Sequence, residues 1–188
     1  MSELPVGATR RQIIDAAVRL IADHGFSATS VDQIAEAAGV AKGSVYYNFG
    51  SKADLFTSIL TEGITRLTAN LRTALETGPE PTPLERLVTA LLRQIRDNPA
   101  FAKVVAAEVF RTGRDWQESI GLIHDQAMAV FAEAVGLGDP DLDPLDARVM
   151  GSAAFGATLV AGLEWLTYQP DRSPTDVLAA ILRMVRRA

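Results

Sequence analysis

The sequence predicts an all-α protein with a small N-terminal helical domain and a larger helical domain behind it. Apolar residues recur at three- and four-residue spacing in one segment after another, which is the period of amphipathic helices. No segment alternates convincingly with the two-residue period of a strand. A run of helix breakers at residues 78–83 separates the early segments from the later ones. We therefore expect domains at residues 1–50 and 51–188, linked by a helix at 52–76.

The first helix is expected at residues 9–23, and the second directly after Ser30. The apolar residues that define the first are Ile13, Ile14, Ala17, Leu20 and Ile21. Gly25 ends this helix, because glycine adopts the left-handed conformation that follows many helices, and Phe26 then enters the small core. Ser30 with Gln33 three residues later has the form of a capping box, which starts the second helix.

Residues 31–48 have the pattern of two helices that cross steeply through a short turn. Gly39 provides the positive φ that the turn requires, and Ala35 is small enough for the second helix to approach the first. The apolar residues expected between the two helices are Ile34, Val40 and Val45. The second helix is expected at residues 41–48. This helix-turn-helix geometry places a recognition helix in the major groove of DNA.

The remaining chain reads as further helices separated by proline and glycine. Ser51 followed by Asp54 caps a long helix at residues 52–76, which is the natural bridge between the domains. Later helices are expected at residues 83–97, 100–112, 116–135, 144–168 and 174–187. The breaks between them fall at Pro99, Gly113, residues 136–144 and Pro170.

Composition excludes several kinds of site. The 188 residues include no cysteine, and the two histidines, His24 and His124, lie far apart, which argues against thiol chemistry and zinc sites. We expect neither a metal nor a cofactor. The N-terminal segment has no apolar stretch after a basic start, so we expect a cytoplasmic protein. The longest apolar run, residues 149–163, is shorter than a membrane span and predicts no membrane helix.

The overall charge is acidic, which limits non-specific attraction to DNA. The net charge is −5, and residues 1–60 carry five Lys or Arg against six Asp or Glu. A helix-turn-helix nevertheless places a few cations and helix N-termini locally against phosphates. We therefore expect weak non-specific DNA binding with a modest dependence on salt.

One stretch of the chain combines several specific features. It reads GVAKGSVYYNFGSKADLF at residues 39–56 and follows TSVDQIAEAA and a helix with paired arginines. The glycine turn, the Tyr-Tyr-x-Phe end of the recognition helix and the following Ser-Lys occur together. This combination, over residues 10–59, resembles the DNA-binding domain of the TetR/AcrR family of bacterial transcriptional regulators. Asn48 stands where the family usually has histidine.

The C-terminal part is similar to the family in its pattern, with Asn98-Pro99 before Phe101. The resemblance implies a homodimer in which the helices at 144–168 and 174–187 form a four-helix interface. It also implies a ligand cavity inside the regulatory domain. The expected function is therefore that of a regulator, most often a repressor, that leaves a palindromic double-stranded DNA operator when a small effector binds.

The helix expected at residues 144–168 is rich in small side chains, which let backbones approach closely. They are Gly151, Ala153, Ala154, Gly156, Ala157, Ala161 and Gly162. Close packing within the monomer explains them, and so does a two-fold interface. We favour the interface because symmetric reading of DNA requires a partner chain.

The recognition helix is expected to present its N-terminal turn to base edges. Lys42 is expected to donate to guanine and Gly43 to permit close approach, and an ordinary solvated lysine is the alternative for Lys42. Tyr47 is expected to point outward to a phosphate, because adjacent tyrosines do not share a helix face. The resemblance assigns Lys52 to the DNA backbone. The candidate DNA contacts are Thr29, Ser30, Lys42, Gly43, Ser44, Tyr47, Asn48 and Lys52. Helix capping explains the first two of these equally well.

The effector site is expected in the second half of the chain. Its candidate residues are Phe101, Val105, Glu108, Trp116, Ile120, His124, Met128, Phe131, Phe155 and Leu159. Core packing explains most of these apolar positions as well. His124 is a polar ring among apolar positions and requires a partner, either solvent or Glu108. An apolar lining with few polar groups predicts an uncharged or amphipathic small molecule.

Two other classes of function are compatible with the sequence. An enzyme that uses the C-terminal cavity has conceivable acid or base groups in Glu108, His124 and Glu164, but no nucleophile elbow, phosphate loop or metal spacing accompanies them. The second class is a helical scaffold whose helix-turn-helix binds protein. We therefore expect no catalytic residues, and a regulator is the function that the sequence favours.

Overall fold

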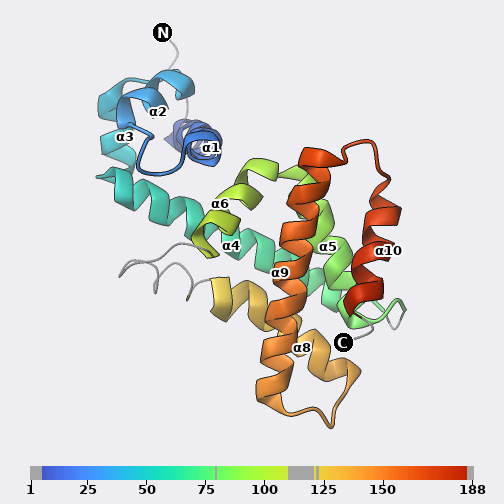
Figure 1. The fold of residues 1–188 in the computed structure, drawn as a ribbon. Coiled ribbons are helices and arrows are strands. Elements are labelled where there is room, and N and C mark those ends of the chain that lie inside the picture. Colours follow the sequence, from blue (N-terminus) through green and yellow to red (C-terminus); the bar gives the residue numbers. More distant parts are fainter. Residues whose placement is uncertain (1–5, 79, 110–120, 122, 186–188) are drawn as a thin grey trace.

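The computed structural model describes residues 6–78, 80–109, 121 and 123–185 (Figure 1). Its regular elements are α1 (Val6–His24), α2 (Val31–Ala38), α3 (Lys42–Phe49), α4 (Lys52–Leu75), α5 (Pro83–Asp97), α6 (Pro99–Val109), the π-helical turn η1 (His124–Met128), α8 (Ala129–Gly138), α9 (Pro144–Tyr168) and α10 (Pro174–Val185). Every regular element among these residues is a helix, so the predicted all-α fold is confirmed. The first three helices lie at one end of α4, and α5, α8, α9 and α10 lie toward its other end (Figure 1).

The N-terminal unit folds as its local sequence signals predict. Ser30 accepts a hydrogen bond from the Gln33 N–H, and the Gln33 side chain accepts one from the Ser30 N–H, which completes the capping box of α2. Gly39 has a φ of 67° and donates its N–H to carbonyls at the end of α2. This left-handed residue turns the chain into α3, where Val45 is buried together with Ile34 of α2.

The long helix α4 belongs to two hydrophobic cores. Leu55 and Ile59 near its start pack with α1, α2 and α3. Ile64 and Leu71 pack with α5, α8 and α9. The carbonyls at the end of α4 accept hydrogen bonds from Arg86 of α5, at 3.0 and 2.8 Å. One helix therefore connects the two cores, and a tilt at either end of it moves the other end.

Helix α9 runs through the C-terminal core and packs on both α5 and α8. Phe155 is fully buried and meets Phe131 of α8 edge to face, with ring centroids 5.6 Å apart. A Cβ on Gly151 would lie 2.4 Å from a backbone nitrogen of α8, and one on Gly162 would lie 2.8 Å from Ile95 of α5. These two glycines therefore serve packing within the monomer. Assigning them to a two-fold interface was wrong.

Some helix boundaries differ from those predicted. Helix α6 begins at Pro99 and not after it, because proline suits the first turn, whose N–H groups have no partner within the helix. The segment predicted as one α-helix at 116–135 lies partly outside the described residues, at 116–120 and 122. Its described part contains the π-helical turn η1, and the helix continues to Gly138. Val130 and Ala134 are also buried, because they lie on the same helical face as Ala127 and Phe131.

One described helix, α9, is long and apolar enough to cross a membrane when judged by length and composition alone. It has 25 residues, and the mean hydropathy of its most apolar window is 1.4. Buried core helices satisfy the same test, and 39% of this window is buried within the protein. The helix packs on α5 and α8, so its apolar composition is consistent with a core helix that has one uncovered face.

Candidate nucleic-acid interface and effector cavity

Helix α3 lies at the outer edge of the N-terminal unit (Figure 1). Val45 and Phe49 anchor it in the core. Its first turn is open, because Ala41 provides no side-chain cap and both Lys42 and Gly43 are exposed. A Cβ added to Gly43 would meet nothing within 4 Å. The N-terminal turn of α3 is therefore free to approach a groove of DNA.

The two tyrosines of α3 differ in exposure. Tyr47 is 84% exposed, whereas Tyr46 is 45% exposed and lies partly against the protein. Adjacent positions on a helix point to different sides, which accounts for the difference. Tyr47 thus presents its hydroxyl to solvent, and its contact with a phosphate stays a prediction.

Lys42 is held by an ion pair that the sequence did not predict. Its Nζ lies 2.9 Å from Oδ2 of Asp32 on α2, and this hydrogen bond is the main cause that raises the pKa of Lys42. Both side chains are more than half exposed, so solvent screens the pair and its contribution to stability is small. Acidic residues are common in the first turn of a helix, because they interact favourably with the helix dipole. The presence of Asp32 at this position therefore did not indicate a contact with Lys42.

Lys52 joins the start of α4 to the loop between α1 and α2. Its Nζ donates to the carbonyls of Phe26 and Thr29, both at 2.8 Å, and lies 4.3 Å from the centre of the Phe26 ring. The Phe26 ring in turn packs on Phe56 of α4, with centroids 4.8 Å apart. Lys52 therefore positions this loop. Its contact with the DNA backbone stays a prediction.

Other predicted DNA contacts also have partners within the protein. Thr29 is 2% exposed and donates its hydroxyl to the Gly25 carbonyl at 2.9 Å. Ser30 caps α2. The Asn48 side-chain amide donates a hydrogen bond of 2.8 Å to the backbone carbonyl of Ser44. Ser44 itself is half-buried. These structural roles account for the residues in free protein, and their contacts with DNA stay predictions.

Arg10 is a cation of α1 that contacts the middle of α4. It pairs with Glu62 at 2.5 Å, and this hydrogen bond is the main cause that raises the pKa of Arg10. Its guanidinium also lies 4.9 Å from the centre of the Phe49 ring. Arg10 thus connects α1 with α3 and α4, as Lys52 connects a loop to α4.

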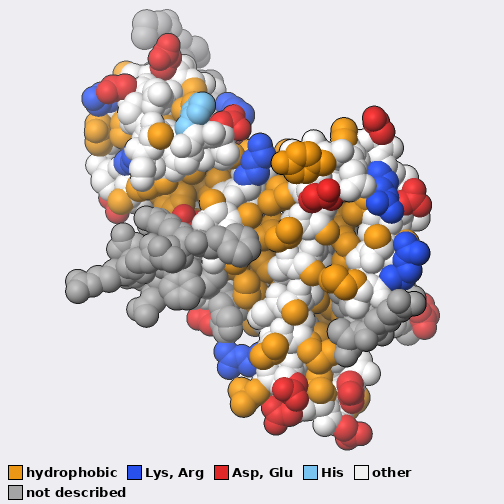
Figure 2. Space-filling view, in the orientation of Figure 1, with side chains coloured by type: hydrophobic (Ala, Val, Ile, Leu, Met, Phe, Trp, Pro, Cys, Tyr) orange, Lys and Arg blue, Asp and Glu red, His pale blue; other side chains and the backbone are white. Residues whose placement is uncertain are grey.

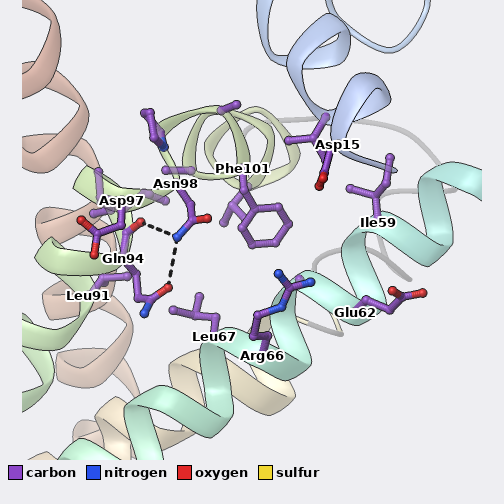
Figure 3. Close-up of a pocket in the computed structure, with 18 of the residues that line it drawn as sticks. Asp15, Ile59, Glu62, Arg66, Leu67, Leu91, Gln94, Asp97, Asn98 and Phe101 are labelled. Carbon is purple, nitrogen blue, oxygen red and sulfur yellow. Dashed lines mark hydrogen bonds between the residues drawn. The ribbon is translucent and has the colours of Figure 1, made fainter. Parts of the chain in front are cut away.

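A cavity of about 410 Å³ lies where α1, α4, α5, α6 and α9 meet (Figure 3). The predicted effector residues that line it are Phe101, Val105, Phe155 and Leu159. Its lining does not include Glu108, Met128 or Phe131, and Glu108 and Phe131 are buried in the protein. Trp116, Ile120 and the side chain of His124 lie outside what the structure describes. The structure thus brings together part of the predicted effector set, and the ligand-binding role of every member stays a prediction.

The charged groups at this cavity come from elements that the sequence did not connect with an effector. They include Asp15 and Arg19 of α1 and Arg66 of α4. All three are exposed and read in the sequence as ordinary solvated side chains. Within the described parts of the chain, no group of three or more His, Cys, Asp or Glu residues is arranged to hold a metal ion.

Comparison with known proteins identifies the N-terminal unit. The family model described as "Bacterial regulatory proteins, tetR family" matches residues 13–59. The transcriptional regulator AcrR of Shigella flexneri is 49% identical over 51 residues, which are 27% of this chain and 24% of that protein. The match to AcrR is thus confined to about a quarter of each protein.

Longer similarities cover both halves of the chain. The transcriptional repressor KstR of Mycolicibacterium smegmatis is 31% identical over 172 residues, which are 89% of this chain and 80% of that protein. The crystal structure of the regulator FadR of Bacillus subtilis in complex with stearoyl-CoA has the same fold, with a TM-score of 0.78 at 21% identity, covering 93% of this chain and 96% of that one. The helix-turn-helix geometry and the extended similarity to KstR lead to the same conclusion: the chain belongs to the tetR family of bacterial transcriptional regulators.

Proposed function

We propose that this regulator is a repressor that binds a palindromic operator as a homodimer and is released by a small apolar or amphipathic effector. The observation that carries the proposal is the exposed first turn of α3, with Lys42 and Gly43 at the surface and Tyr47 exposed at the far end of the helix. We further propose that it acts in the cytoplasm, where bacterial DNA lies. No catalytic step is part of this function.

The proposed division into residues 1–50 for DNA binding and 51–188 for regulation makes α4 the link. The composition of the N-terminal core supports a tight connection between the two halves, because Leu55 and Leu60 of α4 and Val104 of α6 are buried in it. A displacement of α4 or α6 in the regulatory half therefore reaches the recognition helices through packed side chains and not through a flexible linker.

An uncovered apolar face supports the proposed dimer. Figure 2 shows apolar side chains along the surface of α9. The large exposed apolar residues of α9 and α10 are Leu145, Val149, Met150, Val160, Tyr168 and Met184. A group of exposed apolar side chains on neighbouring helices is typical of a protein interface. A second copy related by a two-fold axis covers it with the same helices, which form a four-helix contact.

Release by an effector is supported by the cavity and by a relative. The FadR structure contains stearoyl-CoA, so a regulator with this fold accommodates a large amphipathic molecule. In this chain the cavity of about 410 Å³ is of the size that small-molecule sites occupy.

Footprinting on the intergenic DNA beside the gene for this protein tests the proposed function. We expect protection of a palindromic site whose half-sites lie about one helical turn apart, roughly 10 base pairs, or a multiple of that distance. Protection of a single asymmetric half-site by a monomer contradicts the proposal. Failure to bind any DNA fragment, with retention of a protein partner, supports the scaffold alternative.

A further inference from the structure

We propose that the cavity between α1 and helices α4, α5, α6 and α9 is the effector site, that its ligand is an amphiphile with an anionic head group, and that this ligand contacts the DNA-binding unit directly. The effect of this ligand on operator binding rests on the proposed function. The binding of the ligand to the cavity does not rest on that function, and it is tested without DNA.

The walls of the cavity come from both halves of the protein (Figure 3). Ile14 and Val18 of α1 form one side, and Phe155 and Leu159 of α9 lie in the regulatory core. Ile14 and Val18 also pack against the core that holds α1, α2 and α3 together. A ligand in this cavity therefore contacts the DNA-binding unit itself, in addition to any effect it transmits through α4.

Phe101 of α6 is the contact between the two halves at this site. Its half-buried ring packs against both hydrophobic cores and lies directly on Gly63 of α4. A Cβ on Gly63 would lie 2.1 Å from the ring, so only glycine permits this approach. Figure 3 shows the ring among the lining residues, between α1 and α4. A ligand that enters the cavity meets this ring and the helices on either side of it.

The charges at the cavity favour an anion. Glu62 and Asp97 are already neutralised by Arg10 and Arg96, at 2.5 and 2.8 Å. Figure 3 shows that Glu62 points away from the cavity. Its carboxylate is therefore directed away from the position of a ligand, and its charge is balanced by Arg10.

Two cations and one anion at the cavity have no such partner. Arg19, Arg66 and Asp15 make no ion pair with any residue that the structure describes. Figure 3 shows Arg66 rising from α4 toward the Phe101 ring, with Asp15 on α1 across from it. The unpaired groups leave an excess of positive charge. Guanidinium groups bind carboxylates and phosphates through paired hydrogen bonds, so the head group we infer is one of these anions.

The apolar walls determine the rest of the ligand. Phe155 and Leu159 are almost fully buried, at 0% and 3% exposure, and Val105 beside them is 2% exposed. These side chains offer no hydrogen-bonding group. The part of the ligand that reaches them is therefore a hydrocarbon chain or ring, and the head group remains near Arg66 at the exposed side of the cavity.

Calorimetric titration of the free protein with three ten-carbon amphiphiles tests the head-group charge. The probes are decanoate, decanol and decylamine, which share a chain and differ in charge. We expect decanoate to bind about tenfold or more tightly than the other two, because a hydrogen bond to a charged group adds that much affinity. Equal affinities, tighter binding of decylamine, or no binding of decanoate at millimolar concentration overturns the proposal.

Two variants test the location of the site. Arg66→Met should lose the preference for decanoate over decanol, whereas Arg93→Met, which changes an exposed arginine of α5 outside this cavity, should keep it. Val18→Phe should weaken decanoate binding, because its larger side chain fills the cavity from α1. Unchanged decanoate affinity in either Arg66→Met or Val18→Phe, with an unchanged melting temperature, overturns the assignment. Operator binding is measured separately without amphiphile. A failure of the proposed DNA-binding function is therefore distinguished from a failure of the proposed ligand site.

Discussion

At the scale of single residues, three cations of the N-terminal unit have partners within the protein. Lys42 pairs with Asp32, Lys52 donates to loop carbonyls, and Arg10 pairs with Glu62. Each partner holds a side chain in place in the free protein. If Lys42 and Lys52 contact DNA as we propose, their bonds within the protein must be shared or broken when a base or a phosphate competes for the same cation. With a net charge of −5, this arrangement favours DNA binding that depends on geometry more than on overall charge.

Lys42→Ala should change base preference within the half-site. Loss of a base contact should cost about 1–3 kcal/mol at the affected position, while other positions keep their preference. Competition binding with single-base variants of the operator measures this effect. Asp32→Asn is the matched control, because it frees Lys42 without removing it and should raise affinity for unrelated DNA. Uniform weakening across all sequences by Lys42→Ala would show that the recognition helix has been misplaced.

Lys52→Ala should affect stability as well as DNA binding. The substitution removes two hydrogen bonds from a charged group to the carbonyls of Phe26 and Thr29. We expect the free energy of unfolding to fall by about 1–3 kcal/mol and binding to weaken alike for all sequences, with a salt slope lower by about one per chain. Urea denaturation and binding at several salt concentrations measure the two effects. A stability equal to that of the wild type contradicts the structural role of Lys52.

At the scale of elements, the sequence predicted what local chemistry determines. Three predicted features are present in the structure: the capping box at Ser30, the left-handed Gly39 and the cap at Ser51. Each of them depends only on residues within four positions of itself. The inward packing of Gly151 and Gly162 was not predictable, because it depends on neighbours in α8 and α5 that are distant in sequence. The π-helical turn also lacks a local signal.

Two glycine variants distinguish a glycine that the backbone conformation requires from a glycine that allows the recognition helix to approach DNA. Gly39 and Gly43 both have open space around the position of a Cβ, but only Gly39 has a positive φ. Gly39→Ala should therefore lower the free energy of unfolding by about 1–2 kcal/mol through backbone strain alone. Gly43→Ala should leave stability unchanged or slightly raised, since alanine favours helix, and should reduce operator affinity. Equal stability of the two variants in denaturant would contradict the role of Gly39 in the turn.

At the scale of the whole molecule, α4 and Phe101 connect two cores that form separately along the chain. The sequence predicted Phe101, Val105, Phe155 and Leu159 as effector residues, and the structure gathers them around one cavity. It did not predict that α1 forms a wall of that cavity. Periodicity shows which face of a helix is apolar, but not which distant helix covers it.

The central claim is that one ligand and operator DNA act on the same connected structure, so each must alter the affinity of the other. Calorimetry of decanoate binding, with and without saturating operator, measures this coupling directly. We predict that operator DNA weakens decanoate binding by the same factor by which decanoate weakens operator binding, about 5–150-fold. Identical decanoate affinities in the two titrations would contradict the account.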